Sequence, residues 1–419
     1  MTALAVLVAL SVTACGGDDD DDTGAAADES SETTEAGSDE EAAPSGDPIK
    51  FGVMADTSGT FATTSAVQRA GIEAAVEALN ADGGILGRPI ELIVESTGGD
   101  PTQAAATVEK LISEGAVAIF GATTSADTIQ AKPTIERAEI PMVSGVAQNP
   151  AVTEAPNSSF VFTVTNTVLD AAQIIVEGLQ AAGIEKVGGL TDDTAVSQAS
   201  FPLYMNAIEE AGIEVTGTET VAAVAEDLTA PISRLAEGDP DLIIELTNEG
   251  QTIALVHNTF EQLIPDIQIL TVGPMPSSTE AQDAVDDGAL EGTLFAANVD
   301  PENPRVQEVA DLLGQEPETM SSYGPIMYDS VMMVAQAIEE TGSTEGVEVR
   351  DAMQGISDYP ASWGAEDQTL SFTATKHVAA DFVCGWVLRV FTSENRTGGP
   401  WEDAPTSCET AAHHPEAGS

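Results

Sequence analysis

Short apolar runs alternate with stretches of helical hydrophobic spacing along most of this chain. Residues 49–54 are typical of a buried strand, and the apolar positions of residues 67–80 recur every three or four residues, which predicts a helix. Gly83 and Gly84 follow at the point where a left-handed turn would end that helix. The chain therefore opens its folded part with a strand, a helix and a tight turn.

The same alternation continues to about residue 340. Further strands are predicted at residues 90–94, 117–120, 141–144, 186–190, near 215, 242–246 and 267–272, and further helices after Asp100-Pro101, at 125–137, 169–182 and 200–211, from 251, and at 328–340. Alternating strands and helices indicate an α/β fold with parallel sheets covered by helices. The pattern alone allows one barrel or two doubly wound lobes.

The first fifteen residues have a different character. An apolar run from Ala3 to Val12 leads to Cys15, followed by two glycines and five aspartates. It resembles a bacterial lipoprotein signal, so we expect residues 1–14 to be a signal segment and Cys15 to be lipidated. A leader normally opens with positive charge, but no Lys or Arg precedes Lys50, so we expect the true start upstream of Met1. The alternative is a short buried or tail segment with an accidental cysteine.

Residues 15–47 contain the lipidation candidate and then only small, hydroxyl and acidic residues with one proline. Such a composition cannot bury enough apolar surface to fold, which predicts a disordered acidic tether. With the lipid on Cys15, the protein would lie outside the cytoplasm on the outer face of the cell membrane, held through the lipid anchor alone.

The charge balance excludes two classes of partner. The chain carries 70 Asp and Glu against 13 Lys and Arg, a net charge of −57. Most carboxylates must therefore be solvated surface groups. Nucleic acid and anionic headgroups are bound by basic side chains, so neither is an expected partner.

Two cysteines remain beside Cys15. Cys384 and Cys408 form an even pair in an exported chain, which favours a disulfide that pins the C-terminal tail. Alternatively, Cys384 is a buried strand residue inside the apolar run 382–390.

Several passages occur in the order found in one family. Residues 75–92, 100–104, 119–125, 140–144 and 149–150, together with Tyr323-Gly324-Pro325, resemble leucine/isoleucine/valine-type solute-binding proteins. The resemblance implies a type I periplasmic binding protein fold, in which two doubly wound parallel-sheet lobes are joined by a three-crossover hinge. It also implies a monomeric receptor that closes on a small amino-acid-like or related polar solute and delivers it to the permease of an ABC importer. An extracellular sensor coupled to a signalling partner is the alternative.

Applied to this chain, the resemblance divides it into discontinuous lobes. The N-terminal lobe is expected to comprise residues 48–166 and 297–357, and the C-terminal lobe residues 167–296 and 358–396. Residues 397–419 are expected to be a C-terminal tail.

The strongest candidates for solute binding are Thr123, Thr124 and Ser125, because they lie between a predicted strand and a predicted helix. Ligands of open α/β sheets bind at such junctions, where free backbone N–H groups favour anions. In the resembled family, the counterpart of Ser125 binds the α-carboxylate of the ligand. The alternative is a helix cap, since Thr124 and Asp127 have capping-box spacing.

Further candidates occupy predicted strand ends or positions matched by the resemblance: Ser58, Ala147, Gln148, Asp193, Glu249, Met275 and Tyr323. For most of them, a solvated loop or packing between the lobes is the competing interpretation. Gln148, Met275 and Val196 depart from the pattern of branched-chain amino-acid binders. Met275 stands where a ligand ammonium usually meets an acid, so Glu249 or Asp193 would have to replace that acid.

Signatures of catalysis are missing from the sequence. It contains no Gly-x-Ser-x-Gly elbow, Walker loop or dinucleotide fingerprint. His413 and His414 in the tail are a weak metal candidate that we set aside. We expect no enzyme activity, no cofactor and no metal.

Overall fold

The computed structural model describes residues 44–400 with gaps at 60, 155–157, 274, 276–277, 302, 318–319, 365–367, 381–386 and 393–394. The expected signal segment, the lipidation of Cys15, most of the tether and the pairing of Cys384 with Cys408 lie outside the described residues. Residues 44–47, assigned to the tether above, lie along a turn of the folded part. Ser45 N donates to Gly87 O (2.8 Å), and Arg88 Nε donates to Asp47 O (2.8 Å).

The first sheet is wholly parallel, in the order β2-β1-β3-β4-β5. Its strands are β1 (Ile49–Met54), β2 (Ile90–Glu95), β3 (Ala118–Gly121), β4 (Met142–Val143) and β5 (Val161–Phe162). The connecting helices are α1 (Ala62–Ala81), η1 (Pro101–Gln103) with α2 (Ala104–Ser113), and α3 (Ser125–Ala138), and η2 (Pro150–Val152) precedes β5.

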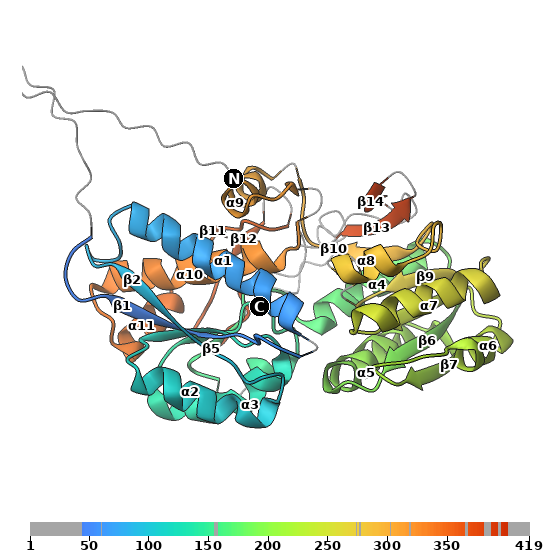
Figure 1. Ribbon diagram of the computed structural model, residues 1–419, viewed down its shortest axis with the longest axis horizontal. Helices are drawn as coiled ribbons and strands as arrows, with labels where there is room; N and C mark the ends of the chain where they lie inside the picture. Colours follow the sequence, from blue (N-terminus) through green and yellow to red (C-terminus); the bar gives the residue numbers. More distant parts are fainter. Residues whose placement is uncertain are drawn as a thin grey trace, which may run out of the picture. The chain divides into compact units, whose positions relative to one another are not determined.

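Three later helices return to this sheet: α9 (Pro304–Leu313), α10 (Tyr323–Thr341) and α11 (Gly346–Met353). A small antiparallel pair, β11 (Tyr359–Pro360) with β12 (Thr369–Leu370), follows them. In Figure 1, α1 and α10 lie on one side of the sheet, and α2 and α3 on the other. The N-terminal lobe therefore has three layers.

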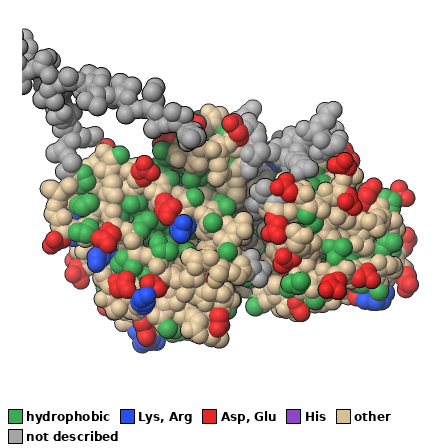
Figure 2. Space-filling view, viewed as in Figure 1, with side chains coloured by type: hydrophobic (Ala, Val, Ile, Leu, Met, Phe, Trp, Pro, Cys, Tyr) green, Lys and Arg blue, Asp and Glu red, His purple; other side chains and the backbone are tan. Residues whose placement is uncertain are grey.

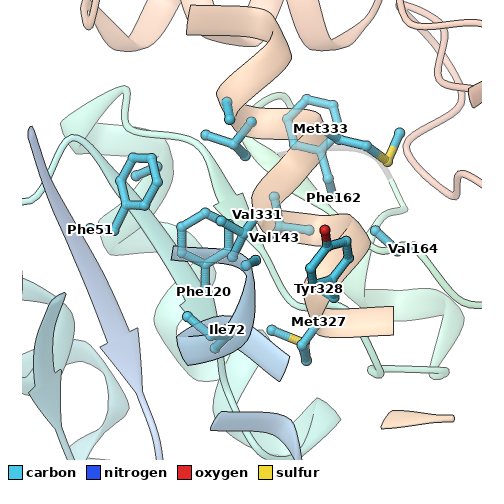
Figure 3. Packing of buried hydrophobic residues seen from close by; sticks show 14 of the residues in the cluster. Phe51, Ile72, Phe120, Val143, Phe162, Val164, Met327, Tyr328, Val331 and Met333 are labelled. Atoms are coloured by element: carbon cyan, nitrogen blue, oxygen red, sulfur yellow. The ribbon is translucent and has the colours of Figure 1, made fainter. Parts of the chain in front are cut away.

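The core between the sheet and α10 is built from large apolar side chains. Phe51 and Phe120 meet edge to face, with ring centroids 5.2 Å apart, and Figure 3 shows Met327 and Val331 of α10 in the same cluster. Alternate strand residues such as Met54 and Ile119 pack on the opposite face with α2 and α3. A strand buried on both faces explains the unbroken apolar runs in the sequence.

The second sheet has the order β14-β13-β10-β9-β8-β6-β7. Strands β6 (Lys186–Asp192), β7 (Glu214–Val221), β8 (Leu242–Leu246), β9 (Gln268–Thr271) and β10 (Leu294–Ala297) are parallel, whereas β13 (Val387–Thr392) and β14 (Asn395–Pro400) add an antiparallel edge. Its helices are α4 (Val168–Ala181), α5 (Ala195–Glu210), α6 (Thr229–Glu237), α7 (Gly250–Leu263) and α8 (Thr279–Ala284). Two separate sheets exclude the single barrel.

The chain passes between the two lobes three times: after β5, after β10 and between residue 380 and β13. Neighbouring segments pair at these passages. Thr163 N donates to His377 O (2.9 Å), Ala379 N donates to Thr163 O (2.9 Å), and Gly364 N donates to Asn298 O (2.9 Å). The first two passages are therefore held by backbone hydrogen bonds to neighbouring segments.

One expected lobe boundary is wrong. Residues 358–396 were assigned to the C-terminal lobe, but Trp363, Phe372 and Ala380 are buried in the core of the N-terminal lobe. The Phe372 ring lies 5.0 Å from that of Phe162 on β5. The stretch up to residue 380 therefore belongs with the first sheet, and the last passage is later than the resemblance suggested.

Figure 2 shows acidic side chains scattered over the visible face, with basic groups at few places. The ion pairs found among described residues are mostly exposed, as in Arg69–Glu73 (3.1 Å) and Lys186–Asp239 (3.7 Å). Exposed pairs contribute little to stability. In the part of the chain that the structure describes, no helix has the length and apolarity needed to cross a bilayer.

A buried histidine makes the stability of the fold depend on pH. His257 of α7 is fully buried, neither ring nitrogen has a hydrogen-bond partner, and burial lowers its pKa from 6.5 to about 4. The unfolded chain binds this proton more readily, so the contribution of His257 is complete above pH 6.5 and is lost as the pH falls toward 4. At pH 5 the loss amounts to about 2 kcal/mol.

We therefore expect a His257→Phe variant to lose less stability between pH 7 and pH 5 than the wild type. Urea denaturation at pH 7 and pH 5 measures the free energy of unfolding that each protein loses between the two pH values. The many carboxylates contribute equally to both losses, so the difference between the losses reports on His257. An equal loss in both proteins would contradict this explanation.

Candidate functional site

The described residues enclose a pocket of about 280 Å³. Its lining follows the carboxyl ends of strands from both sheets, as expected for a ligand site in open α/β folds. The lining residues are Phe61, Thr64, Gln68, Thr123, Thr124, Ser125, Val146, Gln148, Val168, Ala171, Ile175, Val196, Ser200, Tyr204, Leu246, Asn248, Thr271, Val272, Gly273, Gln282, Phe295, Ala296, Asn298, Val299, Met320, Ser321, Ser322, Tyr323 and Arg389.

Thr124 is the N-cap of α3, as the capping-box spacing predicts. Its Oγ1 accepts from Asp127 N (3.2 Å) and donates to Asp127 Oδ2 (2.6 Å). Burial raises the pKa of Asp127, and the bond from Thr124 opposes that rise. The Thr124 hydroxyl is thus occupied within the helix, although the residue lines the pocket.

Ser125 is the first residue of α3 and lies between the helix and the loop before η2. Its Oγ accepts from Asn149 N (3.3 Å), which leaves its own proton available as a donor. Thr123 lies one step behind, where its Oγ1 accepts from Asp56 N (3.2 Å). Of the three candidates at this junction, Thr124 donates its hydroxyl proton within the protein, whereas Ser125 and Thr123 only accept and can still donate to a solute.

The segment after β4 contributes Val146 and Gln148 to the pocket. Gln148 is held by its backbone, because its carbonyl oxygen accepts from Val168 N (2.7 Å) at the start of α4. Ala147 is buried in the core on the α2 and α3 side of the first sheet, and does not line the pocket. Its contribution is to hold the loop in place, since its carbonyl oxygen accepts from Thr163 Oγ1 (3.1 Å).

A polar cluster after β6 and β8 forms the opposite wall. Asp192 is fully buried and accepts from Asn248 N (2.8 Å), Asn248 Nδ2 (3.2 Å) and Thr194 Oγ1 (2.6 Å). Asn248 Nδ2 also donates to Ser197 Oγ (2.7 Å). Asp192 therefore does not reach the pocket itself but positions Asn248, which does.

A second buried acid lies behind Thr271. Glu245 of β8 accepts from Thr271 Oγ1 (2.6 Å) and from Thr247 Oγ1, and burial raises its pKa to about 7. Its side chain is fully buried. Glu245 thus orients the Thr271 hydroxyl in the wall and has no exposed oxygen to offer a solute.

Two tyrosines from different lobes line the pocket. Tyr323 begins α10 and Tyr204 belongs to α5. Burial raises the pKa of both phenols, and the negative charge that an ionised Tyr323 would carry adds to the rise at Tyr204. They remain neutral and can donate hydrogen bonds at any physiological pH.

The structure thus brings Thr123, Thr124, Ser125, Gln148 and Tyr323 together and leaves five candidates out of the lining. Ser58 is exposed, and Met275 is buried in a separate apolar cluster. Asp193 Oδ1 accepts from Ala223 N (2.7 Å), and Glu249 Oε2 caps α7 by accepting from Thr252 N (2.9 Å). The two acids proposed to hold an ammonium group are therefore engaged elsewhere.

Sequence reasoning missed Gln68, Ser200, Thr271 and Arg389, which line the pocket. Arg389 was the most detectable of them, because a basic residue inside an apolar run is unusual in a chain with 13 Lys and Arg. Within the described ranges, no cluster of three His, Cys, Asp or Glu side chains could hold a metal ion.

Comparison with known proteins agrees with this geometry. A family model described as "Periplasmic binding protein" matches residues 48–391. The leucine-, isoleucine-, valine-, threonine- and alanine-binding protein of Pseudomonas aeruginosa is 25% identical over 315 residues, covering 74% of this chain and 82% of the relative. A Leu/Ile/Val-binding protein homolog of Brucella abortus is 26% identical over 314 residues, with coverages of 73% and 82%.

Solved structures give the same fold. The leucine-binding protein LivK of Thermotoga maritima has a TM-score of 0.70 at 23% identity, covering 82% of this chain and 95% of that one. LivJ of Streptococcus pneumoniae, solved with isoleucine, has a TM-score of 0.72 at 21% identity, with coverages of 83% and 97%. These similarities confirm the two-lobe fold class, and the relatives are binding proteins rather than enzymes.

Proposed function

Since the chain belongs to the periplasmic binding protein family, we propose that it is the solute-binding receptor of an ABC importer. Members of this family work outside the cytoplasm, which agrees with the exported location expected from the first residues. The Pseudomonas aeruginosa relative is named for binding leucine, isoleucine, valine, threonine and alanine. By analogy, the solute here is a small organic molecule with a polar head and a compact apolar body.

The observation that carries the proposal is a pocket lined from both sheets. Ser125 and Gln148 come from the first sheet's junctions, and Asn248 and Thr271 from those of the second. Aliphatic and aromatic lining from Ile175, Leu246 and Phe295 suits an apolar body. A volume of about 280 Å³ is near the lower end for small-molecule sites.

We further propose that capture proceeds by hinge closure. A solute that contacts both walls stabilises the closed arrangement because it binds that arrangement more tightly. The closed monomer would then be the form that the permease recognises.

The anchor completes the proposal. Lipidation of Cys15 would hold the receptor beside its permease, and the acidic segment that follows would act as a flexible tether. Mass spectrometry of the exported protein tests this point by detecting a diacylated or triacylated Cys15. An unmodified N-terminus would remove the anchor and leave the pocket proposal intact.

A thermal-shift panel tests the receptor function. A solute that binds only the folded protein raises its stability by RT ln(1 + [L]/Kd), about 2.7 kcal/mol at a hundredfold excess over Kd. The panel includes branched-chain and polar amino acids, amides, aromatic acids and aliphatic acids. If no small solute raises the melting temperature, the receptor proposal fails.

Replacing Ser125 with alanine is expected to weaken solute binding by about threefold to tenfold, because a hydrogen bond contributes roughly 0.5–1.5 kcal/mol. The melting temperature without solute should change little. Thr124→Ala should instead destabilise the protein by about 1 kcal/mol through loss of the cap. Isothermal titration calorimetry and thermal melts separate the two effects.

The control is Ser233→Ala on α6. Ser233 Oγ donates only to the carbonyl oxygen of Thr229 within its own helix (2.7 Å), and the residue does not line the pocket. Equal affinities of the Ser125 and Ser233 variants would remove Ser125 from the site.

A further inference from the structure

The charges around the pocket differ in sign from those of the whole chain. The chain holds 70 Asp and Glu against 13 Lys and Arg, but Arg389 is the one charged side chain among the described lining residues. The other lining side chains are hydroxyl, amide, aromatic, thioether or aliphatic. A pocket whose described lining holds no carboxylate, in so acidic a chain, indicates that the ligand itself carries negative charge.

Arg389 is placed by the sheet. It lies on β13 directly opposite Phe295 of β10, and Phe295 also lines the pocket. Its Nε is buried and has no hydrogen-bond partner. Among the described residues, no carboxylate oxygen forms an ion pair with its guanidinium within 4.0 Å.

Among the described acids, Asp300 is the one whose charge acts on Arg389 appreciably. Burial lowers the pKa of Arg389, and the charge of Asp300 opposes that effect. Arginine keeps its proton in proteins, so the group remains a cation at the pocket wall. A partly buried cation without an ion pair is unfavourable until a counter-charge arrives. A carboxylate matches it best, because guanidinium and carboxylate can share two parallel hydrogen bonds.

For an ammonium group, the described lining offers no carboxylate as a partner. Asp193 and Glu249 do not line the pocket, and each accepts a backbone hydrogen bond elsewhere. The buried acids behind the wall do not line the pocket, and each accepts hydrogen bonds within the protein: Asp56 from Thr97 and Gly99, Asp127 from Thr124, Asp192 from Asn248 and Thr194, and Glu245 from Thr247 and Thr271. A desolvated ammonium would therefore meet neutral acceptors and an arginine of the same sign.

Building on the proposed receptor function, we propose that the preferred solute is a small organic acid without an ammonium group, whose carboxylate pairs with Arg389. The apolar lining takes its hydrocarbon body, and Ser125 with Gln148 takes any polar group at the other end. Arg389 is then the specificity-determining residue that separates this receptor from amino-acid binders.

Matched pairs of solutes test the inference. Leucine is compared with isocaproate, glutamate with glutarate, and phenylalanine with hydrocinnamate, so that each pair differs in the amino group alone. We expect the amino-free acid to bind about tenfold or more tightly in every pair that binds measurably. Calorimetry measures the affinities, and thermal shifts provide a second readout.

Three variants at position 389 assign the preference to the arginine. Arg389→Gln and Arg389→Met should weaken binding of the amino-free acid by about tenfold to a hundredfold, and Arg389→Lys should recover part of that loss. Thermal melts without solute check that each variant folds. Arg234→Gln is the matched control, because it removes the same charge from an exposed residue that pairs with Glu219 and does not line the pocket.

The outcomes separate the two proposals. If the amino acid of each pair binds more tightly, or if Arg389→Gln changes affinity less than Arg234→Gln does, this inference is wrong and the receptor function stands. If no member of any pair shifts the melt, and the broader panel also fails, both proposals are wrong.

Discussion

Replacing Gly71 with alanine is expected to destabilise the protein by roughly 3 kcal/mol or more, although alanine is ordinarily the better helix former by about 1 kcal/mol. Gly71 lies in α1 where the helix crosses α10. A Cβ there would overlap the carbonyl oxygen of Gly324 and lie 2.7 Å from its carbonyl carbon. The new Cβ would meet backbone atoms, so there is no flexible side chain that could move aside. Helix α1 must therefore shift away from α10.

Urea or thermal denaturation measures the effect. Gly217→Ala on β7 is the matched control, because a Cβ at Gly217 meets no atom within 4 Å and its φ is not in the left-handed region. We expect that variant to be neutral or slightly more stable. Equal stabilities of the two variants would show that the α1–α10 contact is looser than the structure indicates.

Replacing Asp192 with alanine is expected to cost about 3 kcal/mol of stability and to weaken solute binding by more than about tenfold. The change leaves the backbone and amide donors of Asn248 and the hydroxyl of Thr194 without their buried acceptor. Asn248 then loses its fixed position in the wall. Denaturation and calorimetry on the same variant measure the two losses.

Asp193→Ala provides the comparison. The neighbouring acid is exposed, accepts one hydrogen bond from Ala223 N, and does not line the pocket. It should lose about 1 kcal/mol or less and keep its affinity. If both variants bind equally well, Asp192 has no role in positioning the pocket wall.

The hydrophobic pattern predicted the main elements because most of them are buried on a continuous face. Residues 49–54 and 242–246 form strands as expected, whereas the helix expected at 67–80 begins at Ala62. The short elements α6, α9, α11 and β10 were missed. The three helices have only two or three buried positions each, and β10 is four residues long, so their conformation depends on tertiary packing that periodicity does not report.

The misplaced boundary near residue 358 has a similar cause. The described residues of 359–380 form only two-residue strands, and their place depends on contacts such as the stacking of His377 on Phe162, with ring centroids 4.2 Å apart. The sequence around residues 359–380 gives no sign of a packing partner that lies more than two hundred residues away in the chain.

The site residues that could be predicted are those whose role depends on their neighbours in the sequence. Thr124 and Ser125 were found because a strand followed by a capped helix is readable in one stretch of sequence. Glu249 and Asp193 were chosen as acidic residues in turns expected at the cleft, but hydrogen bonds from Thr252 N and Ala223 N already engage them. Arg389 was missed because its importance arises from an unpaired state that appears only when β13 lies beside β10.

The discontinuity of the N-terminal lobe has a consequence for how the chain folds. Its core needs α10 and residues up to 380, whereas its sheet ends at Phe162. The C-terminal lobe is built mostly from one uninterrupted stretch, 168–297, and lacks only β13 and β14. Contacts between distant parts of a chain form late because the intervening loop must close first. The C-terminal lobe should therefore gain structure early, while the first sheet waits for nearly the whole polypeptide.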